Sequence, residues 1–308
     1  MTTLQKSGLN ERRLHYFSEV AEVGSIRGAA DRLNVEPSVI SRQIQQLEDE
    51  LGVQLLQRHG RGIIPTEAAK LVINHCRERR SSEALLLTQI SELKGLERGE
   101  IHIVAGEGFI EELVRWVLQD FCQQYPKLVV TLEFANAVDV VRMLANDQAH
   151  IGLAFRPPID PAVRTVMSRK QPMCVITWPG HPLTQKKQPL SLSDVVPYPV
   201  GLMSRGFGLS NLVKLAEYSD RIQFESSLVT NSIATLKSYV KAHLGVTFLS
   251  AHAVANEVAE GQLVALRTKN EVFESAEAHL MVRAGRQLSI AAERLLDMLN
   301  TNAVFHCS

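Results

Sequence analysis

Residues 25–52 have the sequence SIRGAADRLNVEPSVISRQIQQLEDELG. This segment carries the signals that begin and end two helices. Ser25 is a good N-cap for a helix over residues 26–33. Pro37 suits the first position of a second helix, because its missing N–H costs nothing there. Gly52 can adopt the backbone conformation that ends this helix, so two helices joined by a short turn are expected.

A leading helix is expected before this pair. Leu14, Phe17, Val20 and Ala21 recur at helical spacing, so residues 11–23 are predicted to form an amphipathic helix. Three helices of which the last two are joined by a three- or four-residue turn make a helix-turn-helix pattern. The pattern alone identifies little, because any small helical bundle shows it.

Two further features follow the third helix. Residues 54–64 are expected to form two short strands that bend at residues 58–62. Thr66 then caps a helix that contains no Gly or Pro from residue 67 to residue 94. A helix of this length cannot bury its apolar side alone, and the expected partner is a second copy of the chain.

From residue 100 the pattern changes to alternating strands and helices. The expected strands cover residues 101–105, 128–134, 151–155, 173–178, 198–202, 245–249 and 279–282, and the expected helices cover 111–124, 138–146, 231–242 and the segment from 289. This alternation predicts an α/β domain. Two lobes are expected to part near the stiff break at Pro157-Pro158.

The bulk properties limit the class of protein. A chain of 308 residues with 45% hydrophobic residues fits two soluble domains and a connector. No run approaches the ~18 apolar residues of a membrane span. The N-terminus lacks the apolar core of a signal peptide, so a cytoplasmic protein is expected.

The charge distribution and the absence of known motifs limit the kinds of functional site that can be expected. The net charge is zero, and residues 1–66 hold eight basic and eight acidic residues, so DNA binding must rest on local charge segregation. No GxSxG, P-loop, GxGxxG or HExxH motif occurs. Cys76, Cys122, Cys174 and Cys307 form no metal-ligand spacing, and free thiols are expected, with a redox switch left open. No catalytic residue, metal or cofactor is predicted.

The first part of the chain closely resembles the N-terminal domain of LysR-type transcriptional regulators. The resemblance rests on residues 29–35, 37–44 and 47–58, and on Gly60-Arg61-Gly62 and Thr66-Glu67-Ala68. It runs nearly unbroken from Leu14 to Ala69, and a weaker resemblance continues to about residue 300. The implied fold is multi-domain: an all-α winged helix-turn-helix, a long linker helix, and an α/β two-lobed domain like periplasmic binding proteins.

The resemblance also implies partners and limits. The expected partners are double-stranded DNA at an interrupted dyad and a small-molecule effector, with RNA polymerase as an open option. The chain is expected to form a homodimer through the linker helix and then a homotetramer. No contact with a membrane is expected. The expected parts are residues 1–66, 67–98 and 99–308, with lobe I over about 99–156 and 266–308 and lobe II over about 157–265. An α/β enzyme is not expected, because none of the searched catalytic motifs occurs, and a pure solute-binding protein would need a signal peptide and would lack the N-terminal match. One alternative stays open: a regulator with a vestigial, ligand-free C-terminal domain.

Most of the predicted DNA-binding residues lie on the third helix and the wing, while Arg32 lies on the second helix and Thr66 caps the helix after the wing. They are Arg32, Pro37, Ser38, Ser41, Arg42, Gln45, Arg58, Arg61 and Thr66. Arg42 suits bidentate reading of guanine, and the two serine hydroxyls suit phosphates or base edges. Many family members have Ser-Gln-Pro where this chain has Glu36-Pro37-Ser38, so a glutamine that can read adenine is missing.

The predicted effector-binding residues lie on loops that follow strands, where open α/β sheets bind ligands. They are Gly106, Glu107, Gly108, Phe109, Asn136, Phe155, Ser204, Arg205, Phe207, Thr247 and Phe248. Arg205 can grip a carboxylate. Glu107 replaces the neutral hydroxyl that the family often has, and a Glu107/Arg205 pair would suit a zwitterion such as an amino acid.

Overall fold

The computed structural model describes residues 9–59, 62–93, 99–205 and 207–301. The chain divides into two units, residues 1–86 and 87–308, and each is described by itself. Arg61 and Cys307 lie outside the described residues.

Three helices form the N-terminal unit, α1 (Glu11–Val23), α2 (Ile26–Leu33) and α3 (Pro37–Leu51). Ser25 caps α2 by accepting a hydrogen bond from the Gly28 amide, as the sequence predicts. Pro37 begins α3, and Gly52 ends it with a φ of +68°. The helices bury a common apolar core that includes Leu14, Phe17, Val20, Ala29, Ile40 and Leu47.

The wing and the long helix follow. Antiparallel strands β1 (Leu56–His59) and β2 (Gly62–Pro65) form the wing. Thr66 accepts a hydrogen bond from the Ala69 amide at the start of α4 (Glu67–Leu93). Cys76 of α4 is buried against the three-helix core. Farther along, α4 exposes Leu86, Leu87 and Ile90.

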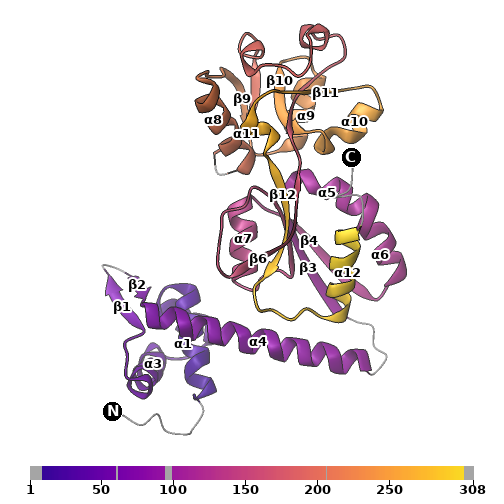
Figure 1. Ribbon diagram of the computed structural model, residues 1–308. Helices are drawn as coiled ribbons and strands as arrows, with labels where there is room; N and C mark the ends of the chain where they lie inside the picture. The colour runs from indigo at the N-terminus through magenta and orange to yellow at the C-terminus, as the bar shows by residue number, and fades with distance from the viewer. Residues whose placement is uncertain (1–8, 60–61, 94–98, 206, 302–308) are drawn as a thin grey trace. The chain divides into compact units, whose positions relative to one another are not determined.

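The C-terminal unit contains two five-stranded sheets (Figure 1). The first has the order β4 (Leu128–Phe134), β3 (Gly99–Ala105), β5 (Ile151–Phe155), β12 (Glu277–Arg283) and β6 (Val163–Lys170). The second has the order β11 (Val264–Arg267), β7 (Met173–Thr177), β10 (Val246–Ser250), β8 (Val200–Met203) and β9 (Ser226–Thr230).

Helices cover both faces of each sheet. Their bounds are α5 (Glu107–Leu113), η1 (Val114–Leu118), α6 (Gln119–Gln124), α7 (Ala137–Ala145), η2 (Pro182–Gln185), η3 (Leu192–Asp194), α8 (Gly208–Asp220), α9 (Ile233–Lys241), η4 (His252–Val254), α10 (Ala255–Ala259), α11 (Glu271–Glu274) and α12 (Ile290–Thr301). On the first sheet α7 covers one face, and α5 to α6 and α12 cover the other (Figure 1). On the second, α8 and α11 lie opposite α9. The predicted two-lobed α/β fold is confirmed.

The predicted parting of the lobes at Pro157-Pro158 is wrong. The strand after it, β6, pairs with β12 in the first sheet, and the second sheet begins only at β7. The chain returns to the first sheet through β12. The prediction failed because β6 (VRTVMSRK) is a mostly polar edge strand without a buried apolar run.

Candidate functional site

One face of α3 carries the predicted recognition residues. Ser38, Ser41, Arg42 and Gln45 are all exposed and follow one another at helical spacing. Pro37 is half-buried at the first helical position, where it fixes the start of α3. The Gln45 amide donates to the Asp49 carboxylate at 3.2 Å. The geometry leaves short hydroxyls and one guanidinium together on one helix face.

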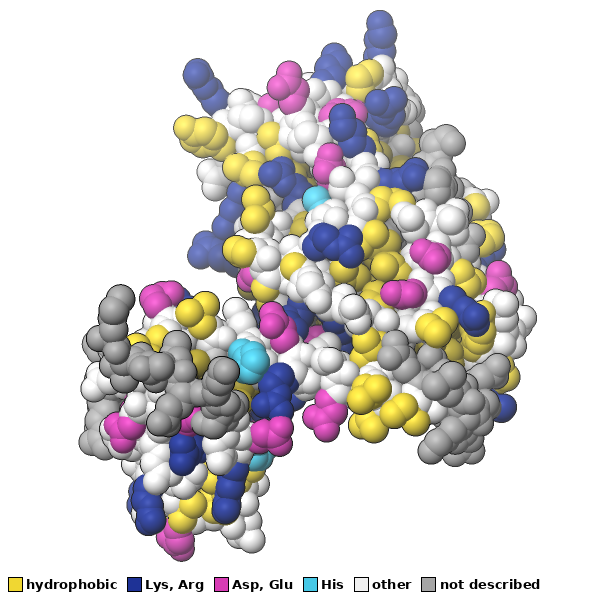
Figure 2. All heavy atoms as spheres, turned by 60° about the horizontal axis from the view of Figure 1, so that its bottom comes forward, with side chains coloured by type: hydrophobic (Ala, Val, Ile, Leu, Met, Phe, Trp, Pro, Cys, Tyr) yellow, Lys and Arg dark blue, Asp and Glu magenta, His cyan; other side chains and the backbone are white. Residues whose placement is uncertain are grey.

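Several acidic side chains of the N-terminal unit are already engaged. Glu50 pairs with Arg13 at 2.7 Å, and Glu19 lies 3.6 Å from Arg32. Glu48 accepts hydrogen bonds from the Leu55 and Leu56 amides and so ties the wing to α3. Among the described residues, Arg27 and Arg42 form no ion pair. Acidic and basic side chains are interspersed on this unit (Figure 2), so charge is segregated only locally.

The remaining predicted DNA-binding residues have mixed positions. Arg58 lies on β1, and Arg61 falls outside the described residues. The Thr66 hydroxyl donates to the Gln54 carbonyl at 2.8 Å and caps α4, so it fixes the junction of wing and helix. Arg32 is exposed but shared between Glu19 and Glu22.

A cavity of about 60 Å³ lies between the two lobes of the C-terminal unit. It lies beyond the carboxyl ends of strands, where open α/β sheets bind ligands. Its wall consists of Gly106, Glu107, Gly108, Phe109, Ala135, Asn136, Ala137, Ala154, Phe155, Gln171, Met173, Met203, Phe207, Gly208, Leu209, Ile233, Leu249, Ser250 and Ala253. Phe155 packs against the cores of both lobes.

Seven of the predicted effector-binding residues line this cavity, and four do not. Those in the wall are Gly106, Glu107, Gly108, Phe109, Asn136, Phe155 and Phe207. Thr247 is buried and donates to the Gly201 carbonyl, and Phe248 packs between Phe224 and Phe273. Ser204 and the exposed Arg205 lie outside the wall. The register of β10 instead brings Leu249 and Ser250 to the cavity.

The sequence missed the contribution of the second lobe's apolar residues. Met173, Met203, Leu209 and Leu249 all line the cavity. Apolar side chains in strands and helices resemble core residues in a sequence, so no local signal separated them. Gln171 is a buried polar residue at the passage between the lobes, and nothing in its neighbourhood singled it out.

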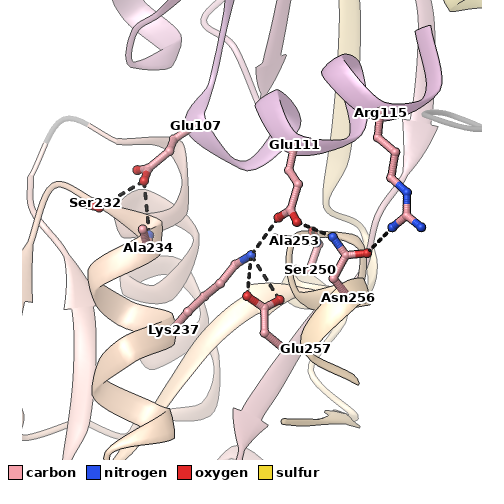
Figure 3. A network of polar contacts seen from close by, with 10 residues as sticks. All are labelled: Glu107, Glu111, Arg115, Ser232, Ala234, Lys237, Ser250, Ala253, Asn256 and Glu257. Carbon is pink, nitrogen blue, oxygen red and sulfur yellow. Dashed lines mark hydrogen bonds and ion pairs between the residues drawn. The ribbon is translucent and has the colours of Figure 1, made fainter. Parts of the chain in front are cut away.

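The predicted Glu107/Arg205 pair is not found. The Glu107 carboxylate instead accepts hydrogen bonds from Ser232 Oγ at 3.0 Å and the Ala234 amide at 3.2 Å (Figure 3). It also accepts a hydrogen bond from the Ile233 amide at 2.7 Å. These donors belong to the N-terminus of α9. A carboxylate of the first lobe thus caps a helix of the second.

A second group of contacts joins the lobes beside the cavity (Figure 3). Lys237 Nζ lies 3.2 Å from Glu111 and 3.0 Å from Glu257. Asn256 donates to Glu111 and accepts from Arg115 at 2.7 Å. Burial alone would raise the pKa of Glu111, but hydrogen bonds from Asn256 and Lys237 lower this pKa below its usual value. The carboxylate therefore stays charged.

The described residues contain neither a metal-ligand cluster nor a membrane-spanning helix. No group of His, Cys, Asp or Glu there is arranged to hold a metal ion. No described helix combines the length and apolar character needed to cross a membrane. Cys76 and Cys174 are free and buried, and burial raises the pKa of both thiols. These thiols are therefore poor nucleophiles.

Family models match both parts of the chain. The model described as "Bacterial regulatory helix-turn-helix protein, lysR family" matches residues 12–70, and "LysR substrate binding domain" matches residues 94–303. The chain belongs to the LysR family. As a LysR-type protein it is a DNA-binding transcriptional regulator with an effector domain at its C-terminal end.

Curated LysR-type relatives match over nearly the whole chain. The transcriptional activator CmpR of Synechocystis is 28% identical over 286 residues, which cover 92% of this chain and 92% of CmpR. The RuBisCO operon transcriptional regulator of Allochromatium vinosum is 26% identical over 299 residues, 96% of this chain and 97% of that protein.

Solved structures share the fold. A full-length OxyR variant from Pseudomonas aeruginosa has a TM-score of 0.64 at 17% identity, with 97% of each chain covered. The regulatory domain of CcmR from Synechocystis, solved with 2-PG, has a TM-score of 0.58 at 21% identity and covers 67% of this chain and 98% of its own.

Proposed function

We propose that this LysR-type regulator contacts its operator through α3 and the wing, and that an effector binding between the C-terminal lobes alters this contact. The observation that carries the proposal is the cavity between the lobes, because it lies where a ligand can contact both. A ligand shifts a conformational equilibrium only if it binds one state better than the other. A site with walls from two lobes meets that requirement, since its shape depends on their angle.

The DNA-binding half rests on the exposed face of α3. Arg42 and the neighbouring hydroxyls suit base edges and phosphates in a major groove. CbnR, which shares this fold, has been solved in a complex with its target DNA. The exposed leucines of α4 suit a partner helix, so two chains would pair through α4 and meet a dyad operator, and two dimers would form a tetramer. We infer that the protein acts in the cytoplasm, as a regulator and not as an enzyme.

The experiment that tests the sensing half is thermal unfolding of the full chain with a panel of small compounds. Both tryptophans, Trp116 and Trp178, lie in the C-terminal unit, so their fluorescence reports its unfolding. An effector raises the Tm by mass action. Ala253→Phe, which places a ring in the cavity wall, should abolish the rise, whereas Ala242→Phe at an exposed position outside the wall should keep it.

A second candidate is a regulator whose C-terminal domain takes no ligand. The observation that favours it is the small size of the cavity, since ligand sites commonly measure ~300–1,000 Å³. No rise in Tm with any compound would support this candidate and contradict the first.

A further inference from the structure

Helix α5 and the π-helical segment η1 present a row of charged side chains to the second lobe. Glu107, Glu111 and Arg115 follow at intervals of four residues, so they share one helix face. Each one contacts the second lobe (Figure 3): Glu107 contacts α9, Glu111 contacts Lys237 and Asn256, and Arg115 contacts Asn256. This row of contacts joins the two lobes.

The Glu107 contact differs from the other two. Its carboxylate accepts hydrogen bonds from two backbone amides of α9 and from the Ser232 hydroxyl that also caps this helix. The first amides of a helix lack partners inside the helix, and the helix dipole favours a negative charge there. The same donors would hold the carboxylate of a free ligand. Glu107 therefore occupies the place that such a ligand group would take.

The backbone is shaped for this approach. A Cβ atom on Gly108 would lie 3.2 Å from Ile233 Cδ1 and 3.8 Å from Ala253 Cβ. A larger residue here would crowd the end of the Ile233 side chain, so Gly108 favours the close approach of α5 to the start of α9. Among the described residues, Glu107 forms no ion pair with Lys, Arg or His. The α9 amides and the Ser232 hydroxyl thus hold the Glu107 carboxylate by hydrogen bonds.

What remains of the cavity is small and apolar. Its volume of about 60 Å³ lies below the ~300–1,000 Å³ of common ligand sites. Phe109, Phe155, Met173, Met203 and Leu209 supply most of the bulk of the wall. A free carboxylate placed there would meet an apolar surface and the negative charge of Glu107, which costs free energy without a paired cation.

We propose that Glu107 is a built-in substitute for an anionic effector. It fills the anion position at the start of α9, so the cavity excludes free carboxylates and selects a small uncharged ligand. This inference rests on the proposed function, since it assigns the ligand class of the same site. It also makes Glu107 the residue that determines specificity.

The test removes the built-in anion and supplies a free one. In full-length Glu107→Ala, the missing atoms are the size of acetate. The Tm of the variant in chloride should fall by about 2–4 °C, the shift typical of losing one such contact in a domain of this size. Acetate at constant ionic strength should restore the Tm in a saturable way, whereas neutral acetamide should not. The wild-type chain should have the same Tm in acetate and chloride.

Two further variants make the result specific. Glu111→Ala also removes a contact between the lobes but leaves Glu107 on α9, so its lower Tm should not respond to acetate. Glu107→Gln keeps the shape of the side chain without the charge, and its Tm should lie below that of the wild type. The Gln variant serves as the reference if the Ala variant does not fold.

Three outcomes would overturn the proposal. They are a wild-type chain that acetate stabilises as much as Glu107→Ala, a folded Glu107→Ala that ignores acetate, and a Glu107→Gln with the wild-type Tm. None of them touches the proposed sensing function, which depends on whether any compound binds the wild-type cavity. Conversely, rescue by acetate would stand even if no natural effector bound.

Discussion

Arg42 extends from a helix face on a unit whose acidic side chains are largely held elsewhere. Glu48 binds the wing, Glu50 binds Arg13, and Glu19 lies beside Arg32. A chain with zero net charge can therefore still present an exposed guanidinium that has no ion pair among the described residues. The net charge alone did not indicate this, because the pairing of acids depends on the fold.

The first prediction concerns this residue. Arg42→Ala should weaken binding to a specific site by about 1–3 kcal/mol and relax the preference at one base pair. The measurement is fluorescence anisotropy at stated salt, on a site selected from random DNA with the full chain. Arg79→Ala is the matched control, because Arg79 is already paired with Glu11, and it should keep the affinity. If Arg42→Ala binds the site with unchanged affinity, the assignment of α3 to the DNA interface is wrong.

The second prediction concerns His150, which precedes β5. Its Nδ1 accepts a hydrogen bond from the His102 amide at 2.8 Å. Burial, and then the charges of Arg286 and His102, lower the pKa of His150 to about 4. The unfolded chain binds a proton near pH 6.5, but the native chain does not until about pH 4, so stability present above pH 6.5 is lost as the pH falls through this window.

The loss from His150 amounts to at most about 3 kcal/mol by pH 4. His150→Gln keeps an acceptor for the His102 amide but does not titrate. Urea unfolding followed by tryptophan fluorescence should therefore show a flatter dependence on pH between 6.5 and 4 than the wild type. His75→Gln, an exposed position on α4, should leave the wild-type slope. Equal slopes in all three proteins would contradict the prediction.

The helix ends could be predicted from the sequence, but the wall of the cavity could be predicted only in part. Ser25, Pro37 and Gly52 act in the helix ends as expected, because caps depend on local backbone chemistry. The wall residues of the cavity depend on sheet register, and Thr247 and Phe248 were assigned although Leu249 and Ser250 line it. The wall residues of β10 are its last two, and the sequence does not show how far along a strand the cavity begins.

At the scale of elements, periodicity located most buried strands and amphipathic helices. It missed β6, α8, β9, α10, β11 and α11. The strand β6 lies at a sheet edge with polar side chains, and β9 (Ser226–Thr230) forms the other sheet's edge, so neither has a continuous apolar run. Edge strands are fixed by pairing with distant neighbours, which a local window does not contain.

The long helix α4 carries the third prediction. Leu71, Leu86, Leu87 and Ile90 are exposed on it, although burial of such side chains normally stabilises a helix. Leu86→Lys should weaken self-association, because a charge cannot be buried between paired helices without a partner. Light scattering after size exclusion should show a smaller particle at micromolar concentration.

Asn74→Lys is the control for this experiment, since it adds the same ammonium group at an exposed polar position of α4. It should keep the wild-type particle size. An unchanged size of Leu86→Lys would mean that α4 does not form the dimer contact through this leucine.

At the scale of the whole molecule, the family and the order of its parts were predictable from the N-terminal residues. The ligand class was not, because it depends on Glu107 meeting α9, and these segments lie more than a hundred residues apart in the sequence. From the sequence, Glu107 with Arg205 suggested a zwitterion. The fold joins Glu107 to a helix end instead, which indicates an uncharged ligand.

The most direct test of a ligand-switched regulator is a footprint of the purified full chain on DNA upstream of its own gene. It is made at physiological salt, with and without each compound that raises the Tm of the C-terminal unit. We expect protection that lengthens, shortens or gains hypersensitive, bent positions with one uncharged compound. Protection that no Tm-raising compound changes would contradict the coupling between the cavity and the DNA-binding unit.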